Sequence, residues 1–336
     1  VLRLRRIHRQ KGADPFKEST MRLRDIAITR DDYELWQTHS IDGLDSTDDA
    51  PWPGGEKLLQ QALYLVADNK QAGRINGNRL ASRAPSLQDP GSASSLSVVV
   101  RCEAKHNNER AVNRKASAFR NIRKAVHLCV GARVFLCLNS IWGASTVPLG
   151  LMNGARGIVV AILYCAPNSN RADGNPLAGT GYPSSASETL PRGVDACPLP
   201  NFIVVNFPDY VGPAFFPGLP RTWVPICAEE VRCEQSKQLC RVNLPVRLAW
   251  AMTLHKAQGI TVHEGTIISF KDASMPRPAS KMGLAFVVWS RATNWNNVAF
   301  ESLPPIDHFL AVRLLSDFKA RARFECEADR LHDALL

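Results

Sequence analysis

The chain has 336 residues, which is enough for two or three domains and at least one sizeable core. Its net charge of +10 and isoelectric point near 9.3 favour a polyanionic partner such as nucleic acid. No apolar run approaches the roughly 18 residues of a membrane span, and the first residues lack the apolar core of a secretory signal.

The nine cysteines are scattered along the chain and form no C-x-x-C pair. The spacing of Cys227, Cys233 and Cys240 does not match a zinc site, so the sequence predicts no metal centre of its own. Cys129 and Cys137 lie inside apolar runs, where cysteine acts as a small buried hydrophobe. This usage is typical of a reducing, intracellular compartment.

The first 30 residues are strongly basic and the next 26 are acidic. Phe16, Met21, Leu23 and Ile26 show a helix-like spacing, which predicts a helix there. The run LLQQALYLVA at 58–67 predicts a buried strand, or a short helix that ends in a strand.

A helix is also predicted after this run, because Asp68 could cap it, although Gly73 and Gly77 weaken the pattern. The Ser, Pro and Gly content of 84–97 indicates a loop. Residues 108–124 are basic and compatible with a helix.

The middle of the chain predicts a small all-β module between two α/β flanks. A turn at Asn153-Gly154 precedes a strand, and the Pro- and Ser-rich segment 167–200 predicts a flexible insertion in a β-hairpin. The strand candidates lie within 130–142, 151–164, 202–215, 221–234 and 238–250.

RLAWAMTLHKAQGITV at 247–262 predicts a strand at 247–252 and a turn at 253–259. The turn holds a His, a Lys, a Gln and a Gly, which can all reach an anion. Polar residues at the carboxyl end of a strand are where open α/β sheets bind ligands. On spacing alone, a surface loop with an ordinary helix cap explains the stretch equally well.

GLAFVVWSRATNWNNVAFE at 283–301 predicts a buried strand, a polar turn with Ser290, Arg291 and Thr293, and a second strand. Apolar residues recur at helical spacing from 309 to 322, which predicts an amphipathic surface helix at 307–336.

LAWAMTLHKAQGIT followed by GLAFVVWSRATN resembles motifs V and VI of superfamily 1B DNA helicases of the Pif and RecD type. Residues 6–24 resemble the segment that carries motif IV in those enzymes, and 130–162 resembles the stretch that enters their SH3-like insertion. The resemblance is patchy between residues 25 and 120 and absent from 167–200. It otherwise spans nearly the whole chain.

The resemblance implies an α/β fold: a RecA-like second motor lobe of the P-loop NTPase type, interrupted by an SH3-like β-barrel. We therefore expect the first part of the lobe at 1–150, the insertion at 151–244, the second part of the lobe at 245–306 and a terminal helix at 307–336.

The same resemblance implies roles for particular residues. Arg291 would be the motif VI arginine finger, held by Ser290 and Thr293, and Arg9 the motif IV arginine; Arg9 is equally explained as one of a solvated basic cluster. The expected nucleotide-binding residues are Gln258, Gly259, Arg291, Arg9 and Gln10.

Single-stranded DNA would be bound through phosphate contacts and aromatic stacking. The expected residues are Thr253, His255, Lys256, Asn153 and Trp142, with Asn139 beside them. His255 is alternatively a structural histidine, Trp142 a core residue, and Asn153-Gly154 simply a tight turn. Asn69 and Lys70 match the family only weakly.

The sequence contains no Walker A loop and no Asp-Glu pair behind an apolar strand. In the resembling family both belong to a first motor lobe, so we expect the site for ATP with Mg²⁺ to be completed by an N-terminal RecA-like lobe of the same gene product. The expected partners are that lobe and single-stranded DNA or DNA duplex junctions.

The resemblance implies the C-terminal motor half of an ATP-dependent 5′-to-3′ DNA helicase, with roles in DNA repair, recombination and telomere maintenance, in the nucleus or mitochondrion if the source is eukaryotic. The alternative is a non-catalytic nucleic-acid-binding remnant of such a helicase. A third hypothesis is a protein-interaction module whose basic charge serves only solubility.

Overall fold

The computed structural model describes residues 15–42, 52, 55–83, 98–139, 141–164, 199–257, 260, 262, 265–270 and 285–333. The chain divides into two compact units. Unit 1 combines Val1–Ile75 with Trp250–Leu336, and unit 2 is Asn76–Ala249. No helix in the described ranges is both long and apolar enough to cross a membrane.

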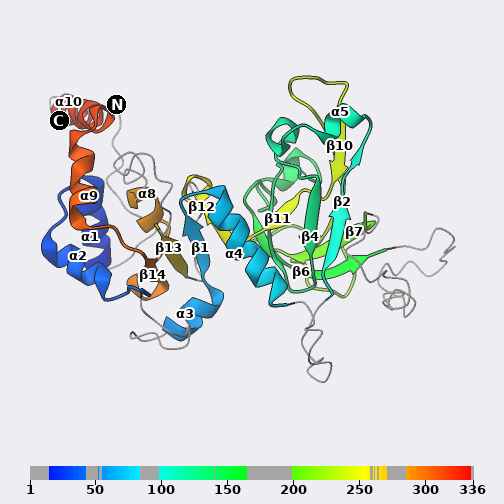
Figure 1. Cartoon of the computed structure of the whole chain (residues 1–336), viewed down its shortest axis with the longest axis horizontal. Coiled ribbons are helices and arrows are strands. Elements are labelled where there is room, and N and C mark those ends of the chain that lie inside the picture. Colours follow the sequence, from blue (N-terminus) through cyan, green and yellow to red (C-terminus); the bar gives the residue numbers. More distant parts are fainter. Residues whose placement is uncertain are drawn as a thin grey trace. The chain divides into compact units, whose positions relative to one another are not determined.

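Unit 1 is built on a four-stranded sheet in which every pairing is parallel (Figure 1). The strand order is β12-β1-β13-β14. The strands are β1 (Leu63–Val66), β12 (Ala251–Thr253), β13 (Thr266–Ser269) and β14 (Val298–Glu301). They are buried almost throughout, as expected for a parallel sheet covered on both faces.

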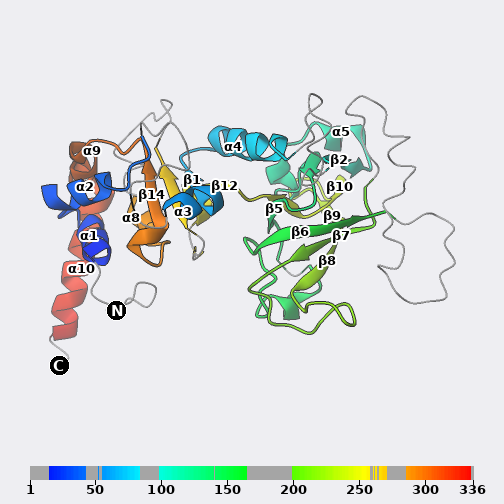
Figure 2. The same cartoon turned by 90° about the horizontal axis from the view of Figure 1, so that it is seen from below.

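Helices flank this sheet, and α1, α2 and α9 group on the side where β14 lies (Figures 1 and 2). The α-helices of unit 1 are α1 (Pro15–Arg24), α2 (Arg30–Gln37), α3 (Gly55–Gln61), α8 (Ala285–Trp289), α9 (Ile306–Leu310) and α10 (Ser316–Asp333). The 3-10 helices are η4 (Leu254–Ala257), η5 (Trp295–Asn297) and η6 (Ala311–Leu314). Helix α4 (Asn69–Ala81) crosses the boundary between the units in the sequence.

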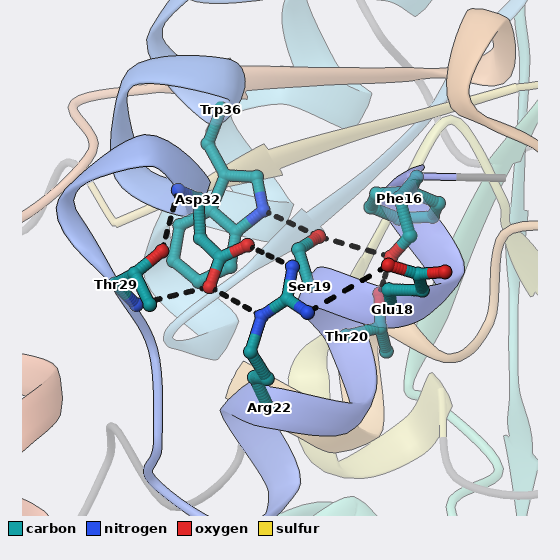
Figure 3. A network of polar contacts seen from close by, with 8 residues as sticks. All are labelled: Phe16, Glu18, Ser19, Thr20, Arg22, Thr29, Asp32 and Trp36. Atoms are coloured by element: carbon teal, nitrogen blue, oxygen red, sulfur yellow. Dashed lines mark hydrogen bonds and ion pairs between the residues drawn. The ribbon is translucent and has the colours of Figure 1, made fainter.

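A polar network joins α1 to the start of α2 (Figure 3). Arg22 donates to both carboxylate oxygens of Asp32, at 2.8 and 2.6 Å. Asp32 and Thr29 also form a capping box, in which each side chain accepts from the other's backbone N–H. The indole of Trp36 donates to the Ser19 hydroxyl at 3.1 Å. The turn between the two helices is therefore fixed by side chains.

Aromatic residues fill the space between these helices and the sheet. Trp289 lies 4.9–6.0 Å, centroid to centroid, from four other rings: Trp36, Phe270, Phe300 and Phe309. Trp36, Trp289, Phe300 and Phe309 are fully buried. Such packing of large rings stabilises a core beyond the area that it buries.

Unit 2 is mainly β structure, and the strand pairings in its described residues are antiparallel. A five-stranded sheet has the order β11-β5-β6-β7-β8, a three-stranded sheet β3-β10-β9, and a two-stranded sheet β2-β4. The strands are β2 (Val100–Glu103), β3 (Lys105–His106), β4 (Ala125–Leu128), β5 (Arg133–Leu136), β6 (Arg156–Leu163), β7 (Phe202–Asn206), β8 (Trp223–Cys227), β9 (Glu229–Arg232), β10 (Cys240–Asn243) and β11 (Val246–Leu248). Its short helices are α5 (Glu109–Val112), η2 (Ala116–Phe119) and η3 (Ala144–Thr146).

Many sequence predictions of local structure are confirmed. Helix α1 lies where the helical spacing begins. For 58–67 the second alternative is confirmed, since the short helix α3 is followed by β1. Asp68 accepts from the Gln71 N–H at 2.8 Å and so caps α4. Gly154 has a φ of 94°, as a tight turn before β6 requires. Cys129 and Cys137 are buried.

Three predictions are wrong. The single strand at 247–252 is two strands, β11 in unit 2 and β12 in unit 1, because the chain changes unit between Ala249 and Trp250. The apolar run at 285–289 is helix α8, and its buried residues Ala285, Val288 and Trp289 have helical spacing. The tail is not one helix, since η6 separates α9 from α10.

The predicted domain boundary at residue 150 also differs from the structure, where unit 2 runs from Asn76 to Ala249. Strand β5, assigned by the sequence to the RecA-like lobe, pairs antiparallel with β6 and belongs to unit 2. A buried strand has the same apolar pattern in either sheet, so the pattern cannot name its partner. Segments 84–97 and 167–200 fall outside the described residues except for 199–200; β6 and β7, which flank the second segment, do form the predicted antiparallel pair.

Candidate functional site

The carboxyl ends of the parallel strands form one edge of unit 1. Val66 is in register with Thr253 on one side and with Ser269 on the other. Because parallel strands end at the same edge, the segments that follow β1 and β12 lie together there. This edge is the usual ligand side of an open α/β sheet.

The motif V segment leaves β12 as the short 3-10 helix η4. Leu254 and Ala257 are buried, whereas His255 is exposed and Lys256 is partly exposed. Thr253, the last residue of β12, is 7% exposed. Gln258 and Gly259 lie outside the described residues.

Arg291 comes directly after α8, and its side chain is fixed by three hydrogen bonds. Nε donates to the carbonyl of Val287 at 2.7 Å, and one Nη donates to the hydroxyl of Ser290 at 2.8 Å. The other Nη donates to the carbonyl of Ile260 at 3.3 Å. Arg291 therefore contacts the backbone two residues beyond Gln258.

Backbone contacts hold the same two motifs together. The N–H of Val262 donates to the carbonyl of Arg291 at 3.1 Å, and Val262 and Ala292 form an isolated parallel bridge. Helix α8 also packs on η4. Ile260 and Val262, which follow η4, thus lie against Arg291 and Ala292, which follow α8.

The motif IV residues Arg9 and Gln10 lie outside the described residues. The helix that follows them, α1, packs on α8, which carries motif VI. The ring of Phe16 in α1 lies 5.2 Å from Trp295, four residues beyond Arg291. The described part of the motif IV segment is thereby attached to the element that positions Arg291.

The remaining predicted DNA-binding residues, Trp142 and Asn153, belong to unit 2. Trp142 is 45% exposed, its indole N–H donates to the carbonyl of Pro225 at 2.8 Å, and its ring lies 5.6 Å from Phe215. The N–H of Asn153 donates to the side-chain oxygen of Asn139 at 2.8 Å. Trp142 is thus an exposed, fixed ring, and Asn139 and Asn153 shape the turn before β6.

One basic feature was not selected from the sequence as a site. Segment 113–125 in unit 2 contains Arg114, Lys115, Arg120, Arg123 and Lys124 and no acidic residue. Its signal was a run of cations uninterrupted by Asp or Glu. Within the part of the chain that the structure describes, no three or more His, Cys, Asp or Glu residues gather as a metal site would require.

A scan against protein-family models finds no match, and a search of curated proteins finds none either. Solved structures do match. The Pif1 helicase from Candida albicans has a TM-score of 0.57 and 17% identity, over 95% of this chain and 60% of that one. A structure that describes DNA unwinding at forked dsDNA by two coordinating Pif1 helicases has a TM-score of 0.55 and 16% identity, over 95% of this chain and 54% of that one.

A Bacteroides Pif1 helicase in complex with ADP-AlF3 and ssDNA has a TM-score of 0.54 and 16% identity, over 95% of this chain and 56% of that one. At such identities the likeness shows the fold, which is RecA-like α/β. This chain spans just over half the length of the structures it matches.

Proposed function

We propose that this chain is the C-terminal motor half of an ATP-dependent 5′-to-3′ DNA helicase. It contributes the arginine finger and part of the single-stranded DNA contacts, and an N-terminal RecA-like lobe completes the site for ATP with Mg²⁺. We further propose that the β-rich unit 2 contains the SH3-like insertion of such a helicase.

One observation carries this proposal. The Arg291 guanidinium of motif VI is hydrogen bonded to the Ile260 carbonyl of motif V beside the carboxyl edge of a parallel sheet. A hydrolase of this kind needs the two segments to converge, since the arginine and the motif V loop must reach one nucleotide. The match to helicase folds over 95% of the chain supports the same conclusion.

The chemistry assigned to Arg291 is stabilisation of the charge on the terminal phosphate. Arginine suits this task because its planar fork stays charged and can donate two parallel hydrogen bonds to phosphate oxygens. The contacts to Val287, Ser290 and Ile260 orient the guanidinium before any nucleotide arrives, which lowers the reorganisation that catalysis requires. Bound Mg²⁺ would supply further charge neutralisation, from ligands outside this chain.

We assign to motif V contacts with both the nucleotide and the DNA. His255 is exposed on η4, and Lys256 follows it. Both belong to η4 (Leu254–Ala257), which is followed directly by Gln258 and Gly259, to which we assign the nucleotide. In unit 2, the exposed indole of Trp142 offers a face on which a base can stack. Arg9 and Gln10 are proposed to reach the nucleotide from the motif IV side.

The test is ATP hydrolysis by the gene product that includes the first lobe. Arg291→Ala is expected to lower kcat by a factor on the order of 10³, because an arginine finger is worth about that much in phosphoryl transfer. Arg291→Lys keeps the charge but loses the fork and should remain strongly impaired. Arg313→Ala, an exposed arginine of η6 in the same unit, is the matched control and should hydrolyse ATP normally.

Thermal melting of each variant separates catalysis from folding, because Arg291 also makes structural hydrogen bonds. Normal turnover by folded Arg291→Ala would refute the role of Arg291. DNA binding without ATPase activity in the presence of the first lobe would favour the non-catalytic remnant instead.

A further inference from the structure

A basic pocket in unit 2 lies outside the motif V and motif VI surface. Its volume is about 410 Å³, within the range of small-ligand sites. The polar and charged residues that line it are Asn113, Arg114, Lys115, Arg123, Lys124 and Arg241. Among the described residues no acidic side chain lines the pocket, and the charged side chains that line it are all positive.

The four cations of the rim are available to a ligand. Arg114, Lys115, Arg123 and Lys124 are exposed, and no carboxylate among the described residues forms an ion pair with them. Arg114 donates only a long hydrogen bond, 3.4 Å, to the side-chain oxygen of Gln235. Like charges held this close repel one another, and an anion between them removes that cost.

Arg241 on β10 forms the floor of the pocket and is fully buried. Its guanidinium donates to the carbonyls of Ala111, Arg114 and Ile122 at 2.9–3.0 Å and to Nε2 of His106 at 3.0 Å. It also stacks on Phe119, 4.3 Å from the ring centroid. These contacts hold segment 113–125 in place, so the rim is shaped before a ligand binds.

The charge of Arg241 is unusual because its hydrogen-bond partners are neutral. A buried cation is costly unless an opposite charge lies near it, and carbonyl oxygens supply only partial compensation. Charges of the pocket also act on two histidines, although burial is the larger cause of both pKa shifts. Burial first, and then the charges of Arg241 and Lys124, lower the pKa of His106; burial, then Arg101 and Arg123, lower that of His127.

We propose that this pocket binds a phosphodiester group of the DNA strand, as a contact separate from motifs V and VI. The inference rests on the proposed function for the identity of the partner, but the pocket itself belongs to unit 2. Two arginine forks and two lysines match phosphate oxygens. Arg120 is exposed on the same segment and extends the positive surface beyond the pocket. A DNA strand can follow this surface past the pocket, whereas a small anion is too short to reach it.

The first experiment measures binding of a fluorescent oligo(dT) to the full chain by anisotropy at several salt concentrations. Arg123→Ala/Lys124→Ala is compared with the control Arg221→Ala/Lys237→Ala, which removes the same charge from exposed positions of unit 2 outside the pocket. Loss of one phosphate contact should reduce the slope of log K against log salt by about 0.7, which is about a fivefold weaker Kd at 0.1 M salt.

The control double variant should keep the wild-type slope. Equal losses in the two double variants would show a diffuse charge effect and overturn the proposal, as would wild-type affinity of Arg123→Ala/Lys124→Ala. Circular dichroism and melting curves establish that both variants are folded.

A second experiment uses hydrogen exchange of segment 113–125 with oligo(dT) or inorganic pyrophosphate. Protection by oligo(dT) that disappears in Arg123→Ala/Lys124→Ala supports the proposal. Protection by pyrophosphate alone would identify a small-anion site and overturn it. The proposed function and this inference can fail separately. If no version of the chain binds DNA, both the proposed function and this inference are overturned. If His255→Ala/Lys256→Ala loses DNA binding but Arg123→Ala/Lys124→Ala keeps it, only this inference is overturned.

Discussion

The two units differ in strand direction, and this decides whether the residues that follow different strands lie at the same edge of the sheet. In unit 1 all four strands are parallel, so the polar residues after β1 and β12 share one edge. In unit 2 successive strands run in opposite directions, and their ends alternate between two edges. A ligand site can therefore be inferred from strand ends in unit 1. In unit 2 the proposed ligand site is formed instead by segment 113–125 and by the buried Arg241, which holds that segment.

The two regions are also held together differently. The core of unit 1 is stabilised by packed aromatic side chains, with Trp289 at the centre of the cluster. In unit 2 the basic segment depends on Arg241, a charged side chain that binds three backbone carbonyls. This contrast leads to four predictions about stability and its location.

The largest effect is expected for Trp289→Ala. Removing a fully buried tryptophan should lower the free energy of unfolding of unit 1 by about 3–5 kcal/mol, because it leaves a cavity among four rings. Denaturant unfolding measures the loss, and hydrogen exchange shows its location in β13 and β14. Leu314→Ala, at a side chain that is 75% exposed, should change little. If amide exchange in β6 and β7 of unit 2 became equally faster, the expectation that the two units have separate cores would be wrong.

Arg241→Met should destabilise unit 2 by about 3 kcal/mol, since three backbone carbonyls, two of them in buried hydrogen bonds, lose their donor. We expect faster amide exchange in segment 113–125 and unchanged exchange in β1 and β13. Arg232→Ala is the control, because its side chain is 70% exposed. Unaltered exchange in 113–125 would show that Arg241 does not hold the segment.

Asp32→Ala should cost about 1–2 kcal/mol, from the lost helix cap and the lost pair with Arg22. Burial acts to raise the pKa of Asp32, but hydrogen bonds from Arg22 and Thr29 lower it overall. The carboxylate therefore stabilises the fold above its ordinary pKa, near 3.8, and this contribution is lost as the pH falls. Asp25→Ala, whose side chain is 46% exposed, should cost less than about 0.5 kcal/mol in the same unfolding assay.

The smallest effect is a pH dependence from His39. Its ring is stacked between Trp52 and Trp295, at 4.5 and 3.8 Å, and Nδ1 donates to the carbonyl of Val298 at 2.8 Å. Burial lowers the pKa of His39, and the bond to Val298 only partly opposes this. The folded state thus prefers neutral His39, so its contribution is present above about pH 6.5 and falls at lower pH.

Melting temperature against pH checks this expectation. His39→Gln should flatten the decline of Tm between pH 7 and pH 5 relative to the wild type. His308→Gln, at an exposed histidine of α9, should leave the decline as it is. An identical profile for wild type and His39→Gln would show that protonation of His39 does not matter to the fold.

Several parts of the fold could be predicted because their cause is local. Asp68 caps α4, Gly154 makes the turn before β6, and the apolar runs at 63–66 and 202–206 become strands. The run 285–289 was assigned to the wrong element because a short apolar stretch suits both a buried strand and a buried helix. Only its packing on η4 and the aromatic core distinguishes them.

The candidate site was partly predictable in the same sense. Arg291 and the motif V turn were identified by their residue types and by resemblance, but the contact between Arg291 and Ile260 depends on how the chain folds back. The pocket around Arg241 was missed, because its floor comes from β10 and its rim from a segment more than a hundred residues earlier. No local pattern connects the two.

The amino-acid sequence by itself determined helix α1, the cap of α4, the turn at Gly154, several apolar strands, the positive charge, and the residue types capable of binding phosphate. These follow from interactions between residues close together in the chain. Tertiary structure alone decided which strands are partners, where unit 2 begins and ends, and which cations share a pocket. Those outcomes depend on burying apolar surface between distant segments, and the same apolar pattern satisfies more than one arrangement until the whole chain packs.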